Sequence, residues 1–313
     1  MKTPKISVII PAHNEEDTIK NSINSVLNQS FQDFEIIVVN DGSTDKTRKI
    51  VEKLIKKDKR IKLLNFDKGH SAGFGRNRGT EVSNGEILFF LDADNSIDVS
   101  FLKKIDNIFN KNPSISAIIS RTKNIYTNKF SKTLALIAWE NPANLKRGIV
   151  HKDVKINFYI IKKDSFIKLG KFRDNIKYFD DTDLAHRFYD AGYSAFVEPT
   201  LILKSEQPNN WRGFYRQYKW AGQGIATLEE KRFKTKTILY TITKNLFIFF
   251  SLIVMVFNLY LGFILLAISI FLTYLFALRT SKNYLYALFL IPIIYIKNLI
   301  LLYHIIKFSL FKK

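Results

Sequence analysis

Residues 86–95 read EILFFLDADN, an apolar run that ends at two aspartates, Asp92 and Asp94. The run is short, continuously apolar and rich in residues that favour strands, so it predicts a buried β-strand. Two carboxylates this close repel each other and lose hydration where they are buried. A strand with this ending therefore predicts a positive group beside its two acids.

Three earlier segments repeat the pattern of an apolar run followed by polar residues. Residues 6–10 (ISVII), 35–39 (EIIVV) and 61–66 (IKLLNF) are mainly apolar, and the loops after them read PAHNEED, NDGSTD and DKGHSAG. Amphipathic helical spacing follows the first two runs. Strands alternating with helices, each nearly continuously apolar, predict an α/β fold with a mainly parallel sheet flanked by helices. In such sheets ligands bind at the carboxyl edge, where the four loops would meet.

The first two loops contain residues that commonly cap helices. We expect Asn14 to cap the first helix, with the acids of residues 15–17 in its first turn, where the helix dipole favours negative charge. Residues 43–45 can cap the second helix. Asp41 is not explained by capping, and an acid at a strand end can accept N–H donors from a nucleobase edge.

Asp92 and Asp94 form a D-x-D motif that suits a metal ion. Alternate residues of an extended segment share a face, so both carboxylates can address one ligand. Mg²⁺ or Mn²⁺ on a diphosphate would resolve their repulsion, because such ions take few protein carboxylates and complete their shell with phosphate oxygens and water. A solvated turn is the structural alternative.

Two further segments carry candidate functional groups. Residues 69–79, GHSAGFGRNRG, combine glycines that permit close backbone approach with Arg76 and Arg78, which can neutralise phosphates. A flexible loop is the alternative there. Residues 178–187, YFDDTDLAHR, place three acids at the start of an amphipathic segment. These acids are either complements of a helix dipole or include a partly desolvated general base.

Composition excludes some classes of site and partner. The chain has 313 residues and no cysteine, which rules out disulfides and thiolate metal sites. The formal net charge of +20 indicates a polyanionic neighbour. The basic run of residues 46–62 has no interleaved aromatic side chains, so it predicts a solvated or membrane-facing helix, and we expect no nucleic-acid partner.

The C-terminal part predicts a membrane segment. Residues 246–277 contain no charged side chain, and this run is too long for one untilted helix of ~20 residues but suits two, with a turn near Asn258. The next apolar stretch, residues 284–306, either spans the membrane or lies in its interface. Basic residues at 231–236 and after the second span favour a multi-pass protein of the cell membrane with a cytoplasmic N-terminal domain.

These observations divide the chain into three expected parts. Residues 1–224 form the α/β domain, residues 225–236 a basic juxtamembrane linker, and residues 237–313 the membrane domain. The segment WRGFYRQYKWAGQG, residues 211–224, precedes the membrane part. Its cations and aromatic side chains fit either an interfacial belt or a lid over a phosphate-bearing ligand.

Taken in order, these motifs resemble the inverting, GT-A-fold glycosyltransferases of family 2, which use nucleotide-diphosphate sugars. The matching stretches are residues 7–47, GFGRNRG at 73–79, GEILFFLDADN at 85–95 and FDDTDLAHR at 179–187. The resemblance covers most of residues 5–220. It implies a GT-A catalytic domain followed by transmembrane helices.

The resemblance also implies roles for individual residues. The residues that would bind the nucleotide sugar are Pro11, Ala12, His13, Glu15, Asp41, Arg76 and Asp92. Among them, the first three would line the base pocket, Asp41 would hydrogen-bond the base, and Asp92 would face the ribose and the metal. Asp94 would hold Mg²⁺ or Mn²⁺ on the diphosphate.

In this family the catalytic base is the aspartate of a Glu-Asp pair followed by x-Asp-Leu. Here the pair is Asp180-Asp181, so Asp181 takes the position of the base, and Asp180 departs from the pattern, which leaves both carboxylates open as the acting group. Membrane-embedded relatives carry Gln-x-x-Arg-Trp, and here Gln217-Tyr218-Lys219-Trp220 is one residue shorter. Expected contacts with the acceptor or diphosphate are Asp180, Asp183, Gln217, Lys219 and Trp220.

We therefore expect a membrane-anchored, metal-dependent glycosyltransferase of the hexosyltransferase type. It would move a sugar from a UDP- or GDP-sugar to a hydroxyl of a lipid-linked saccharide or glycolipid, because a hydroxyl needs a base and an ionised lipid phosphate does not. A polyprenyl-phosphate glycosyltransferase and a non-catalytic nucleotide-sugar-binding membrane protein are the alternatives.

Overall fold

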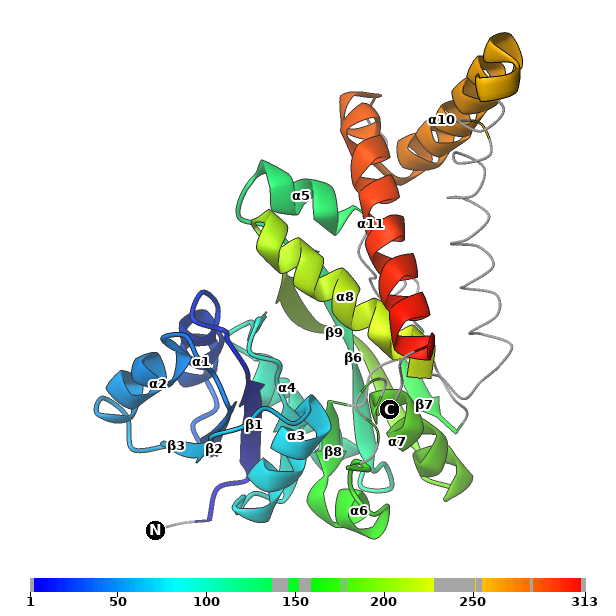
Figure 1. Ribbon diagram of the computed structural model, residues 1–313. Helices are drawn as coiled ribbons and strands as arrows, with labels where there is room; N and C mark the ends of the chain where they lie inside the picture. Colours follow the sequence, from blue (N-terminus) through cyan, green and yellow to red (C-terminus); the bar gives the residue numbers. More distant parts are fainter. Residues whose placement is uncertain are drawn as a thin grey trace. The chain divides into compact units, whose positions relative to one another are not determined.

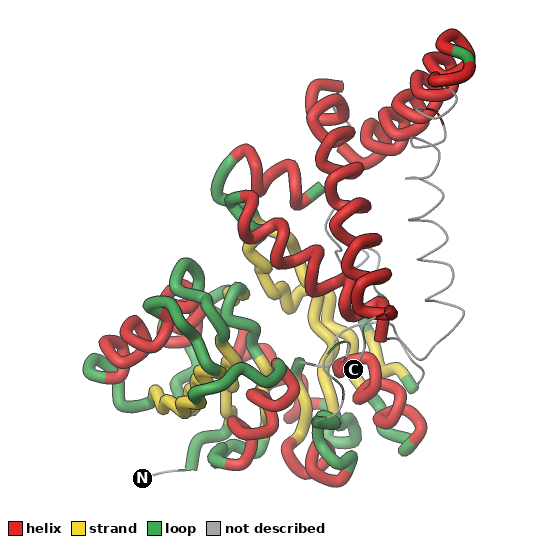
Figure 2. The backbone as a smooth tube through the Cα atoms, viewed as in Figure 1, coloured by secondary structure: helices red, strands yellow, loops and turns green. Residues whose placement is uncertain are grey.

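The structure is a computed structural model, drawn in Figure 1 and Figure 2. It describes residues 3–136, 146–151, 159–174, 176, 178, 180–227, 251, 255–281 and 284–310. The chain divides into two compact units, Met1–Asn124 with Glu140–Glu206, and Ile125–Trp139 with Gln207–Lys313. The expected basic linker and the first expected membrane helix lie largely in residues 228–250, outside the described residues. The three expected domain limits stay predictions.

The first half of the sheet is parallel, as the sequence predicts. Its strands are β1 (Ile6–Ala12), β2 (Phe34–Asp41), β3 (Ile61–Phe66) and β4 (Ile87–Phe90). They lie in the order β3-β2-β1-β4, and each neighbouring pair is parallel. All four carboxyl ends therefore share one edge of the sheet.

The second half of the sheet is antiparallel, which the sequence does not indicate. Its strands are β5 (Asn95–Ile97), β6 (Ala117–Ile125), β7 (Gly148–Val150), β8 (Ile160–Lys162) and β9 (Ala195–Glu206). β8 pairs with β4 and β6, while β9 pairs with β5 and β7, all antiparallel. The full order is β3-β2-β1-β4-β8-β6-β9-β5 with β7 beside β9, so the sheet is mixed.

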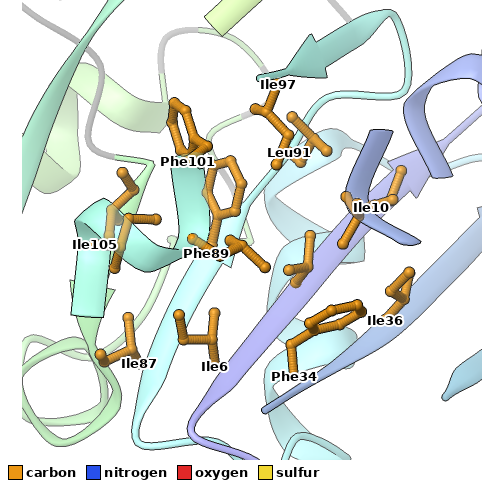
Figure 3. Packing of buried hydrophobic residues seen from close by; sticks show 14 of the residues in the cluster. Ile6, Ile10, Phe34, Ile36, Ile87, Phe89, Leu91, Ile97, Phe101 and Ile105 are labelled. Carbon is orange, nitrogen blue, oxygen red and sulfur yellow. The ribbon is translucent and has the colours of Figure 1, made fainter. Parts of the chain in front are cut away.

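One face of the sheet is covered by helices from the N-terminal part of the chain. Ile6 and Ile10 of β1 pack in a buried cluster with α1 (Ile19–Leu27), α2 (Thr47–Ile55) and α4 (Phe101–Lys111), part of which Figure 3 shows. The apolar side chains of these amphipathic helices recur at helical spacing and face the strands. Burial of this cluster is the main apolar contribution on this side.

A second buried cluster covers the opposite face. Ile9 of β1 packs there with Phe166 and Phe188, which come from α6 (Lys163–Lys168) and α7 (Asp180–Asp190). Successive side chains of a strand point to opposite faces, and both faces of β1 are buried. This double burial explains why the apolar run of β1 is continuous instead of alternating.

The glycine-rich segment forms a helix, α3 (Ala72–Glu81), which the sequence did not predict and which replaces the flexible loop considered as the alternative. Ser71 caps it, because the Ser71 hydroxyl accepts a hydrogen bond from Phe74 N at 3.1 Å. A methyl group on Gly79 would lie 2.4 Å from Ile9 Cγ2. The absence of a side chain at Gly79 thus lets α3 lie directly against β1, and this packing outweighs the low helix propensity of glycine.

The expectation that Asn14 caps the first helix is wrong. α1 begins at Ile19, and its first turn contains no acid. Asn14 has a positive φ of 59°, and its side-chain oxygen accepts a hydrogen bond from Thr44 N at 2.8 Å. Asn14 therefore joins the loop after β1 to the loop after β2. In the second loop Asp45 Oδ1 accepts from Thr47 N, the first residue of α2, at 2.9 Å. The N-cap position itself is Lys46, which makes no side-chain capping hydrogen bond, so none of residues 43–45 occupies the N-cap.

The second unit is helical in its described part. Its helices are α5 (Lys129–Ala135), α8 (Trp211–Thr227), α10 (Leu259–Ser281) and α11 (Tyr284–Leu310). Two segments, Leu259–Arg279 and Leu290–Phe308, are long and apolar enough to cross a membrane by length and composition. Asn258 precedes α10 and accepts a hydrogen bond from Leu261 N at 3.0 Å, so a turn stands where the sequence predicts one.

We expect Gly79→Ala to lower the free energy of unfolding by about 1–3 kcal/mol, because the added methyl group must displace Ile9 in a packed core. Thermal unfolding of the purified full-length chain measures this as a fall in midpoint of about 2–10 °C. Glu81→Ala, at the exposed end of the same helix, is the control and should change the midpoint by less than about 2 °C. An unchanged midpoint for Gly79→Ala would show that α3 does not approach β1 this closely.

Candidate active site

The candidate site lies in the first unit at the carboxyl ends of the parallel strands. Pro11 and Ala12 end β1, Asp41 ends β2, and Asp92 and Asp94 follow β4. Because β1 lies between β2 and β4, these residues are neighbours at one edge. The polar segments that the sequence singles out are thus brought together by the topology.

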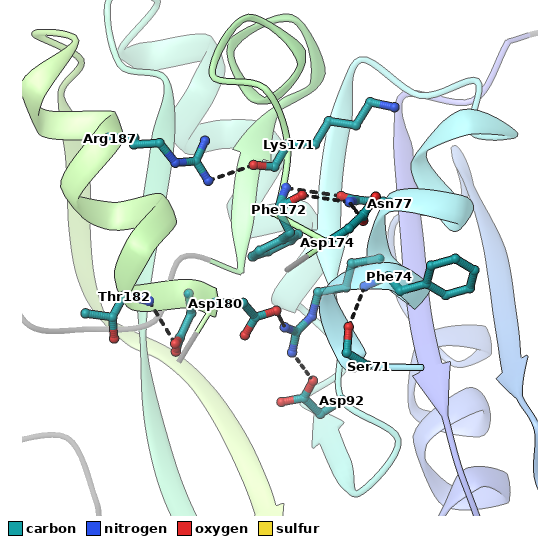
Figure 4. A network of polar contacts seen from close by, with 12 residues as sticks. Ser71, Phe74, Asn77, Asp92, Lys171, Phe172, Asp174, Asp180, Thr182 and Arg187 are labelled. Carbon is teal, nitrogen blue, oxygen red and sulfur yellow. Dashed lines mark hydrogen bonds and ion pairs between the residues drawn. The ribbon is translucent and has the colours of Figure 1, made fainter. Parts of the chain in front are cut away.

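The positive group beside Asp92 is Arg76 of α3. Arg76 Nη2 donates to Asp92 Oδ1 at 2.8 Å, and Nη1 donates to Asp180 Oδ2 at 2.9 Å (Figure 4). We call these three residues the ion triad. Burial opposes the charge on Arg76, but the carboxylates of Asp180 and Asp92 outweigh it and raise the pKa of the guanidinium. Arg76 is therefore a permanent cation that links α3, the end of β4 and the start of α7.

Two features of α3 allow the ion triad to form. A methyl group on Gly73 would lie 2.8 Å from Asp180 Oδ2, so only glycine leaves room for that carboxylate. Asn77 donates to Phe172 O at 2.8 Å and accepts from Phe172 N at 3.1 Å, which fixes the segment that leads to α7 (Figure 4). The glycines of residues 69–79 therefore serve packing and approach within the protein.

Asp181 is adjacent to the ion triad. Burial raises the pKa of the Asp181 carboxyl to about 6, with a further upward contribution from Asp180, while Arg76 acts in the opposite direction. Thr182 N donates to Asp181 Oδ1 at 2.8 Å and orients it. A carboxylate with this pKa is partly protonated near neutral pH and is suited to accept a proton from a bound hydroxyl.

Asp94 differs from Asp92 in its surroundings. Burial raises the pKa of Asp94 well above its usual range, and the carboxylates of Asp92, Glu15 and Glu206 add to the shift. In the part of the chain that the structure describes, none of the ion pairs includes Asp94. The same described residues contain no group of three histidine or carboxylate side chains that could hold a metal by itself. Asp94 therefore lies in a region of negative electrostatic potential, which a bound cation would neutralise.

His70 is a site residue that the sequence did not single out. Its backbone N–H donates to Asp41 Oδ2 at 2.7 Å, and its Nδ1 lies 2.8 Å from Asp41 Oδ1. The His70 ring stacks on Phe74 with 4.0 Å between ring centroids. The contact could have been predicted from the strand order, because the loop after β3 must lie beside the end of β2 when the two strands are parallel neighbours.

The loop after β1 is held against the loop after β2. His13 Nδ1 lies 2.6 Å from Asp41 O. Glu15 N donates to Thr47 Oγ1 at 2.8 Å, and the Glu15 carboxylate accepts from Thr18 Oγ1 at 2.9 Å. His13 and Asp41, which the sequence predicts to share a site, are therefore in direct contact.

Asp183 forms ion pairs within the first unit. Its Oδ1 pairs with Arg173 Nη1 at 3.0 Å, and its Oδ2 pairs with Arg187 Nη2 at 2.7 Å. Arg187 also donates to Lys171 O at 2.7 Å, as Figure 4 shows. These contacts give Asp183 a structural role at the start of α7.

The expected contact residues Gln217, Lys219 and Trp220 lie on α8 in the second unit.

Comparisons with known proteins place these observations in a family. The model described as Glycosyl transferase family 2 matches residues 7–170. A probable glycosyltransferase of Bacillus subtilis, YdaM, is 29% identical over 231 residues, which are 70% of this chain and 54% of YdaM. GalNAc(5)-diNAcBac-PP-undecaprenol beta-1,3-glucosyltransferase of Campylobacter jejuni is 31% identical over 162 residues, 51% of this chain and 47% of that enzyme. The chain thus spans about half the length of these two relatives.

Solved structures show the same fold. The structure of TarS residues 1–349 from S. aureus in complex with UDP-GlcNAc has a TM-score of 0.58 at 19% identity, and covers 97% of this chain and 90% of that one. The same part of TarS in complex with UDP has a TM-score of 0.55 at 21% identity, with 74% and 68% covered. This likeness confirms the predicted fold class.

We expect Arg76→Met to destabilise the protein by about 3–5 kcal/mol at pH 7, because it leaves the Asp92 and Asp180 carboxylates without their cation. The loss should shrink as the pH falls towards the acidic range, where protonation removes the unpaired charges. Thermal unfolding over a pH series measures both effects. Arg78→Met, on the same helix in a half-buried pair with Glu81, is the matched control and should cost less than about 1 kcal/mol at every pH. A loss that does not depend on pH would contradict the assignment.

Proposed function

We propose, from the premise that the chain belongs to glycosyl transferase family 2, that it moves a sugar from a nucleotide-diphosphate sugar to a hydroxyl of a lipid-linked saccharide or glycolipid. The family membership makes it a glycosyltransferase with a nucleotide-sugar donor. The hexosyl type of the transferred sugar, the hydroxyl acceptor and the metal are the parts that we add. The hydroxyl acceptor and the metal are supported by residues of the first unit.

The observation that best supports the proposal is the raised pKa of the Asp181 carboxyl. Its pKa of about 6 and its place beside the ion triad make it the best candidate for the base. Asp180 is the weaker candidate, because its carboxylate already accepts a charge-assisted hydrogen bond from Arg76 at 2.9 Å. We therefore assign proton removal to Asp181 and positioning to Asp180.

The proposed reaction is a single displacement at the anomeric carbon of the donor sugar. Asp181 accepts the proton of the acceptor hydroxyl while the oxygen of that hydroxyl forms a bond to the anomeric carbon of the donor sugar. The bond from that carbon to the diphosphate breaks on the opposite face, and the nucleoside diphosphate leaves with the electron pair. The configuration at the anomeric carbon is inverted. Water must be kept from the same position, since it would otherwise hydrolyse the donor.

The metal ion is a proposal that rests on Asp94 and Asp92. Their carboxylate oxygens are suitable ligands for Mg²⁺ or Mn²⁺, which take one or two protein carboxylates and complete the shell with phosphate oxygens and water. Burial and the nearby carboxylates of Asp92, Glu15 and Glu206 raise the pKa of Asp94, so the residues present fit such an ion. When bound, it would stabilise charge on the leaving diphosphate as a Lewis acid.

The donor and acceptor classes draw support from the comparisons. TarS has been crystallised with UDP-GlcNAc, which supports a UDP-sugar donor for this chain. The name of the Campylobacter enzyme contains PP-undecaprenol, which supports a lipid-linked saccharide as the acceptor. In the site, Asp41 with His13 and His70 would face the base, and Asp92 the ribose. Two candidate spans support a multi-pass membrane protein, and we propose a cytoplasmic catalytic domain.

We expect kcat/KM for transfer to rise with pH through a midpoint of about 6 and to level off above it, because Asp181 must be ionised to accept a proton. Asp181→Asn should lower kcat by about 10²–10⁴ at pH 7.5 while UDP binding is kept. Asp190→Asn, at the exposed end of the same helix, is the control and should behave as the wild type. Transfer of a radiolabelled sugar to extracted membrane lipids measures these rates.

The same assay separates the competing interpretations. Asp180→Asn removes a negative neighbour and should move the rising limb to lower pH while leaving measurable transfer. If Asp180→Asn abolished transfer and Asp181→Asn did not, Asp180 would be the base. If Asp181→Asn left transfer intact while Asp94→Asn abolished it, a polyprenyl-phosphate acceptor would replace the hydroxyl. Metal-dependent nucleotide binding without any transfer or donor hydrolysis would indicate a non-catalytic protein.

We expect Mn²⁺ with UDP to raise the midpoint of thermal unfolding of the wild type, because both bind only the folded chain. Asp94→Asn should remove the Mn²⁺-dependent part of this rise and retain the part that UDP gives alone. Asp98→Asn, a nearby exposed acid paired with Lys204, is the matched control and should keep the full effect. A Mn²⁺ effect that survives in Asp94→Asn would contradict the assignment of this residue.

A further inference from the structure

Arg121 on β6 is a cation without a partner in the part of the chain that the structure describes. It is partly buried, and its Nε atom is buried without a hydrogen-bond acceptor. The ion pairs of the described residues do not include Arg121, whereas Arg76 and Arg187 each pair with carboxylates. A buried guanidinium loses hydration and here gains no hydrogen bond in return, so stability does not explain it.

The strand register places Arg121 level with Asp92. Ile118 on β6 and Phe89 on β4 both pair with Ile160 of β8, which lies between the two strands. Because β8 is antiparallel to both, β4 and β6 run in the same direction. Arg121 lies three residues after Ile118, and Asp92 lies three residues after Phe89. The two residues are therefore at the same height of the sheet and two strand spacings apart, which is ~10 Å.

Arg121 and Asp92 also share a face of the sheet. Ile119 of β6 and Phe90 of β4 both lie in the buried cluster that α6 and α7 cover. Leu91 lies in the cluster of the opposite face, so the side chains still alternate at the end of β4. Two residues after Ile119 and Phe90, the strands therefore direct Arg121 and Asp92 to the face of α7. This is the face that carries the ion triad.

The proposed reaction has a direction along this edge of the sheet. Asp41, which would face the base, ends β2, and Asp92, which would face the ribose, follows β4. Beyond β4 the strand order continues with β8 and then β6. An inverting displacement requires the leaving diphosphate and the attacking hydroxyl on opposite sides of the anomeric carbon. With the nucleotide at β2 and β4, the acceptor would therefore approach from the side of β6, where Arg121 lies.

We propose that Arg121 binds a phosphate group of the acceptor, with Lys123, exposed two residues further along β6, as a second positive charge. The inference rests on the proposed function, because it concerns the acceptor of the same reaction. A guanidinium binds phosphate through two parallel N–H donors, and the unpaired Nε–H of Arg121 is one such donor. This position fits a phosphate close to the reacting hydroxyl, not one at the far end of a long saccharide.

The donor is the other molecule that brings phosphate groups to the site. Its diphosphate is assigned to Asp92 and Asp94 through a metal ion, and Arg76 already lies beside Asp92 at 2.8 Å. Arg121 is two strands further along the sheet, on the side away from β1 and β2. The acceptor phosphate is therefore favoured over the phosphates of the donor.

Phosphate binding is tested on the full chain with saturating Mg²⁺ and UDP, so that the nucleotide site is filled. Inorganic phosphate is titrated at constant ionic strength, and the midpoint of thermal unfolding is recorded. We expect a saturable rise in the wild type, none in Arg121→Met and a smaller rise in Lys123→Met. Arg48→Met, an exposed arginine on α2, is the matched control and should keep the full rise. Without ligands the midpoint of Arg121→Met should not fall, because the guanidinium has no partner to lose.

Transfer kinetics separate the acceptor from the donor. With extracted membrane lipids as the acceptor, we expect Arg121→Met to raise the acceptor KM by about tenfold or more, because charge-assisted hydrogen bonds to the phosphate are lost. The KM for the UDP-sugar should change by less than about twofold. Arg121→Lys keeps the charge without the two parallel donors, and its acceptor KM should lie between those of the wild type and Arg121→Met.

Three results would overturn the proposal while the wild type still transfers sugar, and these leave the proposed function intact. The first is a phosphate-dependent rise that survives in Arg121→Met, and the second is an equal rise when acetate replaces phosphate in the wild type. The third is a KM for the UDP-sugar that rises as much as the acceptor KM, which would assign Arg121 to the donor. A wild type that binds UDP but transfers no sugar would overturn both the proposed function and this inference.

Discussion

The ion triad of Arg76 with Asp92 and Asp180 is the interaction on which the candidate site depends. It joins α3 and the end of β4 to the start of α7, where Asp180 lies 104 residues beyond Arg76 in the sequence. A buried guanidinium between two carboxylates is tolerated only because both partners are present, and removing one leaves a costly buried charge. Gly73 leaves the space for Asp180, so even the unusual composition of α3 serves this contact.

The ion triad also divides the acids of the site into two kinds. Asp92 and Asp180 form ion pairs with Arg76, while Asp94 and Asp181 do not. Burial and neighbouring carboxylates raise the pKa of Asp94 and of Asp181. One of these two acids is therefore available for a cation and the other for a proton. A reaction that combines a charged leaving group with proton removal needs this division.

The sequence predicts the parallel part of the fold and the edge at which the site lies, because continuous apolar runs and the polar loops after them are local signals. It does not predict α3, since glycines weaken a helix unless packing against β1 compensates. The partners of Asp92 and Asp41 were also missed, because Arg76 and His70 become their neighbours only through the order of the strands. The antiparallel half was missed because β7 and β8 have three residues each, and because the directions of the longer β6 and β9 depend on pairing with strands that are distant in the sequence.

The central claim is that Asp181 has a raised pKa that Arg76 holds near neutrality. Infrared difference spectroscopy of the carboxyl band measures this directly over a pH titration of the full chain. The account predicts a carboxyl that titrates near pH 6, disappears in Asp181→Asn and moves to higher pH in Arg76→Met, which removes the opposing positive charge. A titration that is the same in the wild type and in Asp181→Asn would contradict the account.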